Sequence, residues 1–451
     1  MERQQQFKYE KAEISSDKDG SLTIDVRQSI VELVFFESLD KPYITGQIAL
    51  SDDAAVFDSM DFSGTHRIHI QMMSEFVKDE DKDGIVMDRS FLMTSIETIV
   101  KSSNAGNSSI YVFNLIDEHA FVSKSKRISR AIRDNLKTEI IKLCQNEVGK
   151  DIDLSYSSDT IQNNFKGIIP YMTPLDAALW LTSKATTSSG MPFFLYASVH
   201  DTNLRFASLD KMLLEPAWNA EIPFVYSPAN TQKQEENLDP VYQYFQVQTM
   251  KATKLQDTMH QLSTGAIGSL YSVLDLGTGQ VSAKHFSLLT LLARANDENT
   301  IKYLRQNIYD PLYKTPVFEE VNIGGEYLHE TNAEIFHKVV SRGVYGEKKS
   351  IHDEVTEEMF LKKLEAAALK TAVFKNMMDV TVPGPGFITS GGSVGDKIRI
   401  NVLSDNTDTE YDDDPLDKMR SGDFLVYNTR HTFRDTRHDV AMTVFKLERG
   451  S

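Results

Sequence analysis

The stretch FITSGGSVGDKIRINVLS (Phe387–Ser404) contains the pattern G-x-S-x-G at Gly391–Gly395. In α/β-hydrolases this pattern places a nucleophilic serine, here Ser393, on a turn between a strand and a helix. The helix is required because its N-terminus and the following amide stabilise the oxyanion. Apolar and polar residues alternate along Lys397–Val402, which predicts a strand instead. The pattern therefore favours a glycine-rich turn, and a serine hydrolase that uses Ser393 is the alternative function.

The same stretch partly matches a phosphate-binding loop. Gly386 and Gly391 have the spacing of its two glycines, but Gly392 stands where the phosphate-binding lysine should be. No helix is predicted to follow. We therefore expect no nucleotide cofactor here.

A second motif resembles the start of an EF-hand calcium loop. Asp79, Asp81, Asp83 and Gly84 have the right spacing, but the twelfth position is Ser90 rather than a bidentate glutamate. The flanking sequences predict strands, whereas an EF-hand needs two helices. A solvated hairpin tip is favoured, and a calcium-dependent surface-binding protein is the third hypothesis.

The histidines form two pairs. His66 and His69 are three residues apart in a predicted strand, so they face opposite sides and cannot share a metal. His431 and His438 flank a predicted turn at Arg434–Arg437 and are expected to be diagonal neighbours across a hairpin. We interpret them as a polar pair at a sheet end, without a third ligand. The sequence thus predicts no catalytic, cofactor-binding or metal site, and it leaves the interface residues unassigned.

Composition restricts the class of protein. With 451 residues, two to four domains are expected, and 41% hydrophobic and 25% charged residues are typical of a globular chain. The single cysteine, Cys144, excludes an internal disulfide framework and a cysteine-based zinc site. The net charge of −17 argues against a general nucleic-acid binder, which needs a basic surface. The polar N-terminus and short apolar runs predict synthesis in the cytoplasm and no membrane insertion.

These residues must be positioned by mostly extended elements. The first 115 or so residues are rich in β-branched and aromatic types separated by turn signals, which predicts an antiparallel sheet or small barrel. The expected strands are Leu22–Val26, Ile30–Phe36, Tyr43–Leu50, His66–Met73, Phe91–Val100 and Ser108–Leu115.

An α/β unit is predicted next. Apolar residues from Ile132 to Leu143 have helical spacing, and Gly149 is expected to end that helix. Thr173 is predicted to cap a second helix that continues to near Gly190, with Pro174 at its first position. Two strands, at 192–198 and 203–209, are expected to follow.

The remainder of the chain predicts strands from Tyr242 to Phe286, a mixed stretch over 287–354, and strands again from Asp379. A helix from Glu357 to Met377 is expected between them, with one face formed by Phe360, Leu364, Ala368 and Ala372. The proposed domains are a first β-barrel at 1–116, a connector at 117–236, a second barrel in two parts at 237–286 and 379–451, and an insertion with its linking helix at 287–378.

The C-terminal sequence is similar to the closing barrel of tail and baseplate hub proteins of contractile-tailed, T4-like phages. The first barrel and the helix–strand–strand unit of that family also resemble SIVELVFFESLDKPYITGQIALSDD and TPLDAALWLTSKATTSSGMPFFLYAS, whereas 287–354 has no counterpart. The residues that match in the closing barrel are Gly395, Asp396, Ile398, Ser421, Gly422, Arg430 and His431.

This resemblance implies a mainly β fold with an α/β connector, two similar tube-like antiparallel barrels, an α+β middle region and a helical insertion. It also implies a structural protein rather than an enzyme. Such a subunit forms a homotrimeric ring that joins the hexameric tail tube, or a tube-initiator protein, to the trimeric central spike, beside other baseplate proteins of the virion. DNA crosses the ring without specific binding, and the acidic loop Asp408–Asp414 is expected at the channel or rim. The hub of a related contractile injection machine fits the same sequence features.

Overall fold

A computed structural model gives the structure of the chain. It describes residues 6–16, 23–52, 56–59, 62–74, 85–101, 109–158, 164–187, 190–227, 243–254, 259, 263, 268–275, 279, 281–287, 322–327, 334–340, 345–346, 362, 366, 370, 374, 377–388, 392–403, 416–417 and 420–447.

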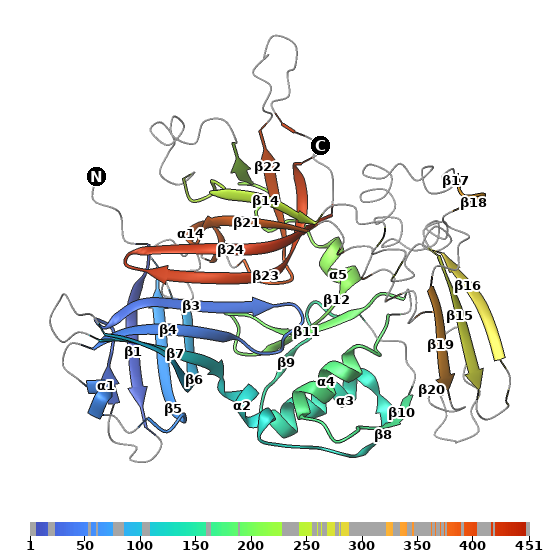
Figure 1. Ribbon diagram of the computed structural model, residues 1–451, viewed down its shortest axis with the longest axis horizontal. Coiled ribbons are helices and arrows are strands. Elements are labelled where there is room, and N and C mark those ends of the chain that lie inside the picture. The colour runs from blue at the N-terminus through green and yellow to red at the C-terminus, as the bar shows by residue number, and fades with distance from the viewer. Residues whose placement is uncertain are drawn as a thin grey trace, which may run out of the picture.

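The largest element is a 13-stranded sheet built from both ends of the chain (Figure 1). Its strands run in the order β14-β21-β24-β23-β3-β4-β7-β6-β5-β1-β2, and β13 and β22 branch from β23. The mainly β fold class is therefore confirmed. The bounds are β1 Lys8–Ser15, β2 Thr23–Asp25, β3 Ile30–Ser38, β4 Thr45–Asp52, β5 His66–Met73, β6 Ile85–Lys101, β7 Ser109–Asp117, β13 Phe224–Tyr226, β14 Thr249–Lys254, β21 Met377–Pro383, β22 Lys397–Val402, β23 Gly422–Arg434 and β24 Arg437–Lys446.

The N-terminal strands form because their side chains alternate between the core and the outer face. Buried and partly exposed residues alternate without exception along β4, β5 and β7. All six strands predicted in this part are present, together with the short helix α1 (Val56–Ser59). Strand β1 was not predicted from the sequence. Most of the residues in its segment KYEKAE are polar or charged, and only Ala12 and Ile14 are buried apolar residues on its inner face.

Strand β23 joins the two β-rich parts of the chain. Its first half, Gly422–Leu425, pairs with β22, and its second half, Asn428–Arg434, pairs with β3. A register shift between Val426 and Asn428 separates the two halves. Because β24 pairs with β23 in both halves and β3 pairs with the second half, the N- and C-terminal parts share one hydrogen-bonded sheet. The proposed domain boundaries at 116, 236, 286 and 378 stay a prediction.

The connector packs helices against two small sheets. Thr173 caps α4 by accepting a hydrogen bond from the backbone of Asp176, and Pro174 is the first helical residue, as predicted. The helix ends at Thr182, however, well before Gly190. The elements are α2 Glu118–Lys124, β8 Ala131–Asn135, α3 Leu136–Lys142, the π-helix η2 Leu143–Val148, β9 Ile152–Asp153, β10 Asn164–Ile168, α4 Pro174–Thr182, β11 Phe193–Ala197, β12 Leu204–Ser208 and α5 Leu209–Leu214.

One predicted helix begins later than expected. Residues Ala131–Asn135 form β8, which pairs with β10, and helical structure starts only at Leu136. Asn135 caps the helix, since its side chain accepts a hydrogen bond from the backbone of Lys137. The predicted end is confirmed by Gly149, which adopts a left-handed conformation with φ of 72°.

Beyond the connector, the structure describes two small sheets, a strand (β20) that pairs with β10 of the connector, and parts of a helix. The strands are β15 Gly268–Asp275, β16 Val281–Ser287, β17 Asn322–Ile323, β18 Glu326–Tyr327, β19 Glu334–Val340 and β20 Tyr345–Gly346. In the predicted helix, Lys362, Ala366 and Lys370 are helical, Met377 already belongs to β21, and the face at 360, 364, 368 and 372 lies outside the described residues.

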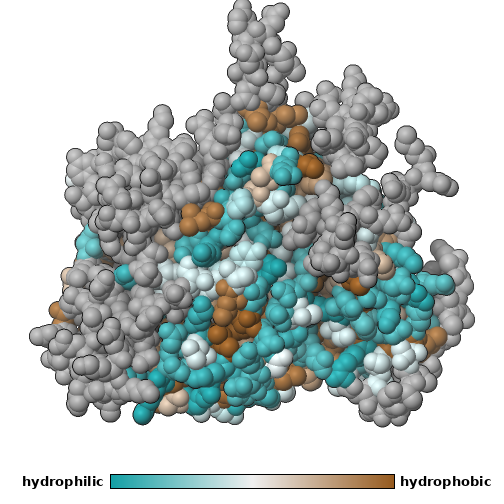
Figure 2. Space-filling model, turned by 180° about the vertical axis from the view of Figure 1, so that it is seen from behind, coloured by the Kyte–Doolittle hydropathy of each residue, from teal (hydrophilic) through white to brown (hydrophobic). Residues whose placement is uncertain are grey.

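Two apolar cores stabilise the fold. One extends from the N-terminal strands through the connector, and the other lies among β13, β21, β22, β23 and β24. Seen from behind, hydrophilic side chains cover most of the described surface (Figure 2). Among the described residues, no helix is long and apolar enough to cross a membrane.

Candidate functional site: the buried junction at the β11–β12 loop

The loop that joins β11 to β12 begins in the interior of the molecule, and within it only Thr202 is exposed. The side chains of Ser198 and Val199 are 0% and 4% exposed, and every residue of β11 is buried. A buried loop must find partners for its backbone polar groups, because water cannot satisfy them. Residues 198–203, called here the junction loop, find these partners in all three parts of the chain.

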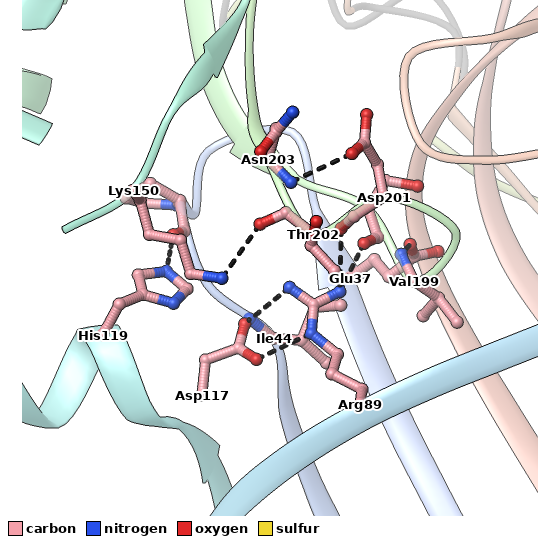
Figure 3. Close-up of polar contacts among 12 residues, drawn as sticks. Glu37, Ile44, Arg89, Asp117, His119, Lys150, Val199, Asp201, Thr202 and Asn203 are labelled. Atoms are coloured by element: carbon pink, nitrogen blue, oxygen red, sulfur yellow. Dashed lines mark hydrogen bonds and ion pairs between the residues drawn. The ribbon is translucent and has the colours of Figure 1, made fainter. Parts of the chain in front are cut away.

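Toward the N-terminal sheet, the partner is a buried ion pair (Figure 3). The Arg89 guanidinium on β6 contacts the Asp117 carboxylate at the end of β7 through two hydrogen bonds, of 2.9 and 3.2 Å. Arg89 Nη1 also donates to the carbonyl oxygens of Ser198, at 2.6 Å, and Asp201, at 3.2 Å. Asp117 Oδ2 accepts from the backbone N–H of Ile44 at 2.7 Å. Both charges are thus paired and hydrogen-bonded, as buried charges must be.

One further contact holds the same side of the loop, and a second lies next to it. Lys150 Nζ donates to the Thr202 carbonyl oxygen at 3.0 Å, and burial together with the nearby Arg89 lowers the pKa of Lys150 (Figure 3). His119 Nε2 lies 2.7 Å from the Pro42 carbonyl oxygen, and burial lowers its pKa. A neutral His119 donates its proton to that oxygen.

Toward the C-terminal strands, the partner is Glu37 on β3. One of its carboxylate oxygens accepts from the backbone N–H of Val199 at 2.5 Å. The other accepts from Thr429 Oγ1 at 2.6 Å and lies 3.0 Å from His431 Nε2. Burial alone would raise the pKa of Glu37, but these hydrogen bonds and the His431 charge hold it at about 2.

The predicted histidine pair lies directly behind Glu37. His431 Nδ1 and His438 Nε2 are 3.4 Å apart across the β23–β24 hairpin, which confirms the diagonal arrangement. Burial and the neighbouring His431 and His200 lower the pKa of His438 well below its ordinary value. Glu37 is the additional polar partner that the sequence interpretation lacked. Within the described residues, no group of three or more histidine, cysteine, aspartate or glutamate side chains is arranged to hold a metal.

Ser393 is part of this junction. Its hydroxyl lies 2.7 Å from the Ser198 hydroxyl, and its side chain is 0% exposed. His200 Nε2 lies 3.0 Å from the Gly392 carbonyl oxygen, so it hydrogen-bonds the turn and not the Ser393 hydroxyl. Strand β22, not a helix, follows the turn, as predicted. Ser393 therefore lacks the elbow geometry and connects the connector to the C-terminal strands.

Asp396 and Gly395 shape this turn. Asp396 Oδ2 accepts from the backbone N–H of Ser393 at 2.7 Å, and burial raises the Asp396 pKa to about 7. Gly395 has φ of 89°, and a Cβ there would lie 2.5 Å from the Tyr196 hydroxyl oxygen. The turn thus packs against β11 so closely that only glycine fits.

The other predicted positions lie elsewhere. His66 is buried and stacks on Phe62, whereas His69 faces outward and pairs with Asp88 at 2.6 Å, which confirms opposite faces. Cys144 is buried, which raises its pKa to about 12.

Three sequence motifs are only partly described. Asp79, Asp81, Asp83 and Gly84 lie outside the described residues, and antiparallel strands β5 and β6 flank them as predicted. The acidic loop Asp408–Asp414 also lies outside them. At the phosphate-loop match, Gly386 belongs to the four-residue helix α14 (Pro385–Ile388), and Gly391 is outside the described residues.

The sequence reasoning missed Glu37, Arg89, Asp117, Ser198 and His200. A signal for three of them was present, because each charged residue occupies the inward phase of an alternating strand. Arg89 falls in the buried series Met87, Phe91 and Met93, and Asp117 follows the buried residues Phe113 and Leu115. A charge on the buried phase indicates a polar partner inside the protein.

Comparison with known proteins gives a fold match but no sequence match. No protein-family model matches the chain, and no curated protein does. The structure is similar to the tail protein from Neisseria meningitidis MC58, with a TM-score of 0.51, 12% sequence identity and 97% of both chains covered.

Two more solved structures are less similar. The 43 kDa tail protein of prophage MuSo2 from Shewanella oneidensis has a TM-score of 0.49 and 10% identity, over 98% of this chain and 100% of that one. A type VI secretion system component from E. coli, described as similar to T4 bacteriophage tail proteins gp27 and gp5, has a TM-score of 0.43 and 10% identity, over 92% and 73%.

The chain thus has the fold of a tail protein, which agrees with the resemblance that the sequence indicated.

Proposed function

We propose that this protein is a non-enzymatic structural subunit of a tail baseplate, the hub. Three copies form a ring that joins the hexameric tail tube to the trimeric central spike. The observation that carries the proposal is the fold match over 97% of both chains to a tail protein. The sequence resemblance to hub proteins, found in the same order along the chain, supports the finer assignment.

The internal construction suits a rigid adaptor. Two β-rich parts share one continuous sheet, and the junction loop ties both to the connector through buried hydrogen bonds. A ring subunit needs such internal rigidity, because closed assemblies depend on a fixed angle between neighbouring contacts. The net charge of −17 suits a channel that DNA crosses without binding.

In this proposal the protein is part of the virion baseplate or of the equivalent part of a contractile injection machine. It is synthesised in the host cytoplasm. Its other partners are the tube or a tube-initiator protein and neighbouring baseplate proteins. The chemistry at Ser393 gives no support to the hydrolase alternative, because its hydroxyl is buried against Ser198.

The test is the mass in solution, measured by light scattering over a concentration series. One chain has a mass of 51.0 kDa, so a trimer has a mass of about 153 kDa. The proposal predicts that the fraction of this trimer increases with protein concentration. A chain that stays at 51.0 kDa even with the purified spike protein present would contradict the hub.

A further inference from the structure

The connector carries a basic surface on an otherwise acidic chain. Between Lys124 and Lys142 the sequence has seven lysines and arginines and only two acidic residues, although the net charge of the chain is −17. The exposed basic residues of this stretch include Lys124, Arg127 and Arg133. We call these three residues, together with Ile168 and Tyr171, the basic face; it lies around β8 and β10 at the lower right of Figure 1.

Backbone pairing places the members of the basic face on two paired segments. Arg127 Nη1 donates to the Lys124 carbonyl oxygen at 3.1 Å, which keeps these two residues together. Ile128 and Met172 form an antiparallel bridge, and Arg127 and Tyr171 each directly precede one of the two bridged residues. Farther along, Ile168 is the cross-strand partner of Ala131, two residues from Arg133 and on the same side of the strand.

The positive charge of this face is not neutralised within the described chain. The two acidic residues of the stretch already have partners: Asp134 pairs with Lys142 at 2.8 Å, and Glu139 pairs with Arg130 at 3.1 Å. Among the residues that the structure describes, none forms an ion pair with Lys124, Arg127 or Arg133.

Two large apolar side chains stand beside these cations. Ile168 and Tyr171 are 67% and 71% exposed. Tyr171 has φ of 45°, a left-handed conformation that is rare for a bulky residue. Hydrogen bonds to Ile169 and between Ile128 and Met172 hold the backbone there. Exposed tyrosine and arginine next to an aliphatic side chain are the composition of protein–protein contacts rather than of an ordinary surface.

We propose that the basic face binds the acidic N-terminal part of a neighbouring copy of this chain. That part, residues 1–116, has 20 acidic and 11 basic residues, so the chain itself carries the complementary charge. A two-fold contact of the basic face with itself would bring like charges together, which is unfavourable. A head-to-tail contact between different surfaces avoids this, and repeated head-to-tail contacts close into a ring. The inference rests on the proposed trimeric hub and assigns its subunit contact.

The experiment compares two double variants that change the net charge equally. Arg127→Glu/Arg133→Glu reverses the basic face, and Lys211→Glu/Lys251→Glu reverses two exposed lysines elsewhere. Circular dichroism confirms that each variant is folded, and light scattering gives the concentration at which half of the chains are trimeric. We expect this concentration to rise at least tenfold for the first variant and to change little for the control, with a smaller difference at high salt.

Tyr171→Asn gives an independent test, because asparagine tolerates the left-handed backbone while removing the ring. It is expected to weaken the trimer without altering its salt dependence. If the wild-type chain forms a trimer and all variants match it, the inference fails while the hub stands. Equal weakening by both double variants also overturns the inference, since total charge then controls assembly. A wild-type chain that stays monomeric with and without the spike overturns the inference and the hub together.

Discussion

The contribution of an ion pair to stability depends on whether it is buried. The side chains of Arg89 and Asp117 are 6% and 3% exposed. They form an ion pair, and Arg89 also hydrogen-bonds the backbone of the junction loop. Arg27 and Asp25 make a comparable pair on the surface, where both are about half exposed. Water screens the surface pair, whereas removing one member of the buried pair leaves the other without a partner.

Arg89→Met is therefore expected to lower the free energy of unfolding by about 3–5 kcal/mol. The control, Arg27→Met, is expected to cost far less because its pair is exposed to water. Urea unfolding followed by circular dichroism measures both. Equal losses for the two variants would show that the buried pair contributes nothing beyond a surface contact.

Asp396 gives a pH dependence of known sign. Burial raises its pKa from 3.8 to about 7, so the folded chain keeps a proton that the unfolded chain releases. The stabilising contribution of this group is therefore present below pH 4 and is lost as the pH rises to 7. Asp396→Asn keeps an oxygen for the Ser393 N–H and removes the titration.

The variant Asp396→Asn is expected to be more stable than the wild type at pH 8, by at most about 4 kcal/mol, and to lose that advantage near pH 4. Urea unfolding at pH 8, 6 and 4 tests this. Because His200 and His438 are present in both proteins, their titration cancels in the comparison. A difference that stays constant with pH would refute the assignment.

At the scale of elements, the turn before β22 is fitted against β11. Gly395 has a left-handed backbone, and the Tyr196 hydroxyl leaves no space for a Cβ atom. Gly149, which ends η2, has a similar φ of 72° but no atom within 4 Å of an added Cβ. Substituting alanine at each position therefore distinguishes the cost of backbone strain alone from the cost of strain plus steric overlap.

Gly149→Ala is expected to cost about 1 kcal/mol from the left-handed backbone alone. Gly395→Ala adds a clash in a packed interior and is expected to cost about 2–4 kcal/mol in total. Thermal unfolding of both variants gives the comparison. If Gly149→Ala proves as costly as Gly395→Ala, the contact between the turn and β11 is not what selects glycine.

At the scale of the whole molecule, the shared sheet should make the two β-rich parts unfold together. The chain has two tryptophans, and each reports on a different core. Trp180 on α4 packs on the larger core, and Trp218 contacts Phe224 and Phe387 of the smaller one. Since β23 belongs to the sheet of both parts, loss of either core disrupts pairing in the other.

Trp180→Phe and Trp218→Phe leave one reporter each. Fluorescence during urea unfolding is expected to give coincident transitions in the two variants, after correction for any shift seen by circular dichroism. Two separated transitions would mean that the parts unfold independently despite the continuous sheet.

Local patterns in the sequence determined most of the elements. β-Branched and aromatic residues between turn signals predicted the strands from Ile30 to Leu115, the Thr173 cap predicted the start of α4, and the alternation after Gly395 argued against a hydrolase elbow. These predictions succeed because periodicity and capping depend on neighbours within a few residues. The error at Ala131–Asn135 has the opposite cause: its helical spacing was overridden by pairing with β10, whose residues lie 29 to 37 positions farther along the chain.

Only the tertiary structure decided the junction. Glu37, His200, Ser393 and His431 come from four separate segments, and pairing of β3 with β23 brings the first and last of them together. A single sequence carries no record of which buried charge meets which partner, because that choice depends on long-range strand pairing and packing. The sequence thus determined most of the strands, and the fold decided which partners their inward-facing residues meet.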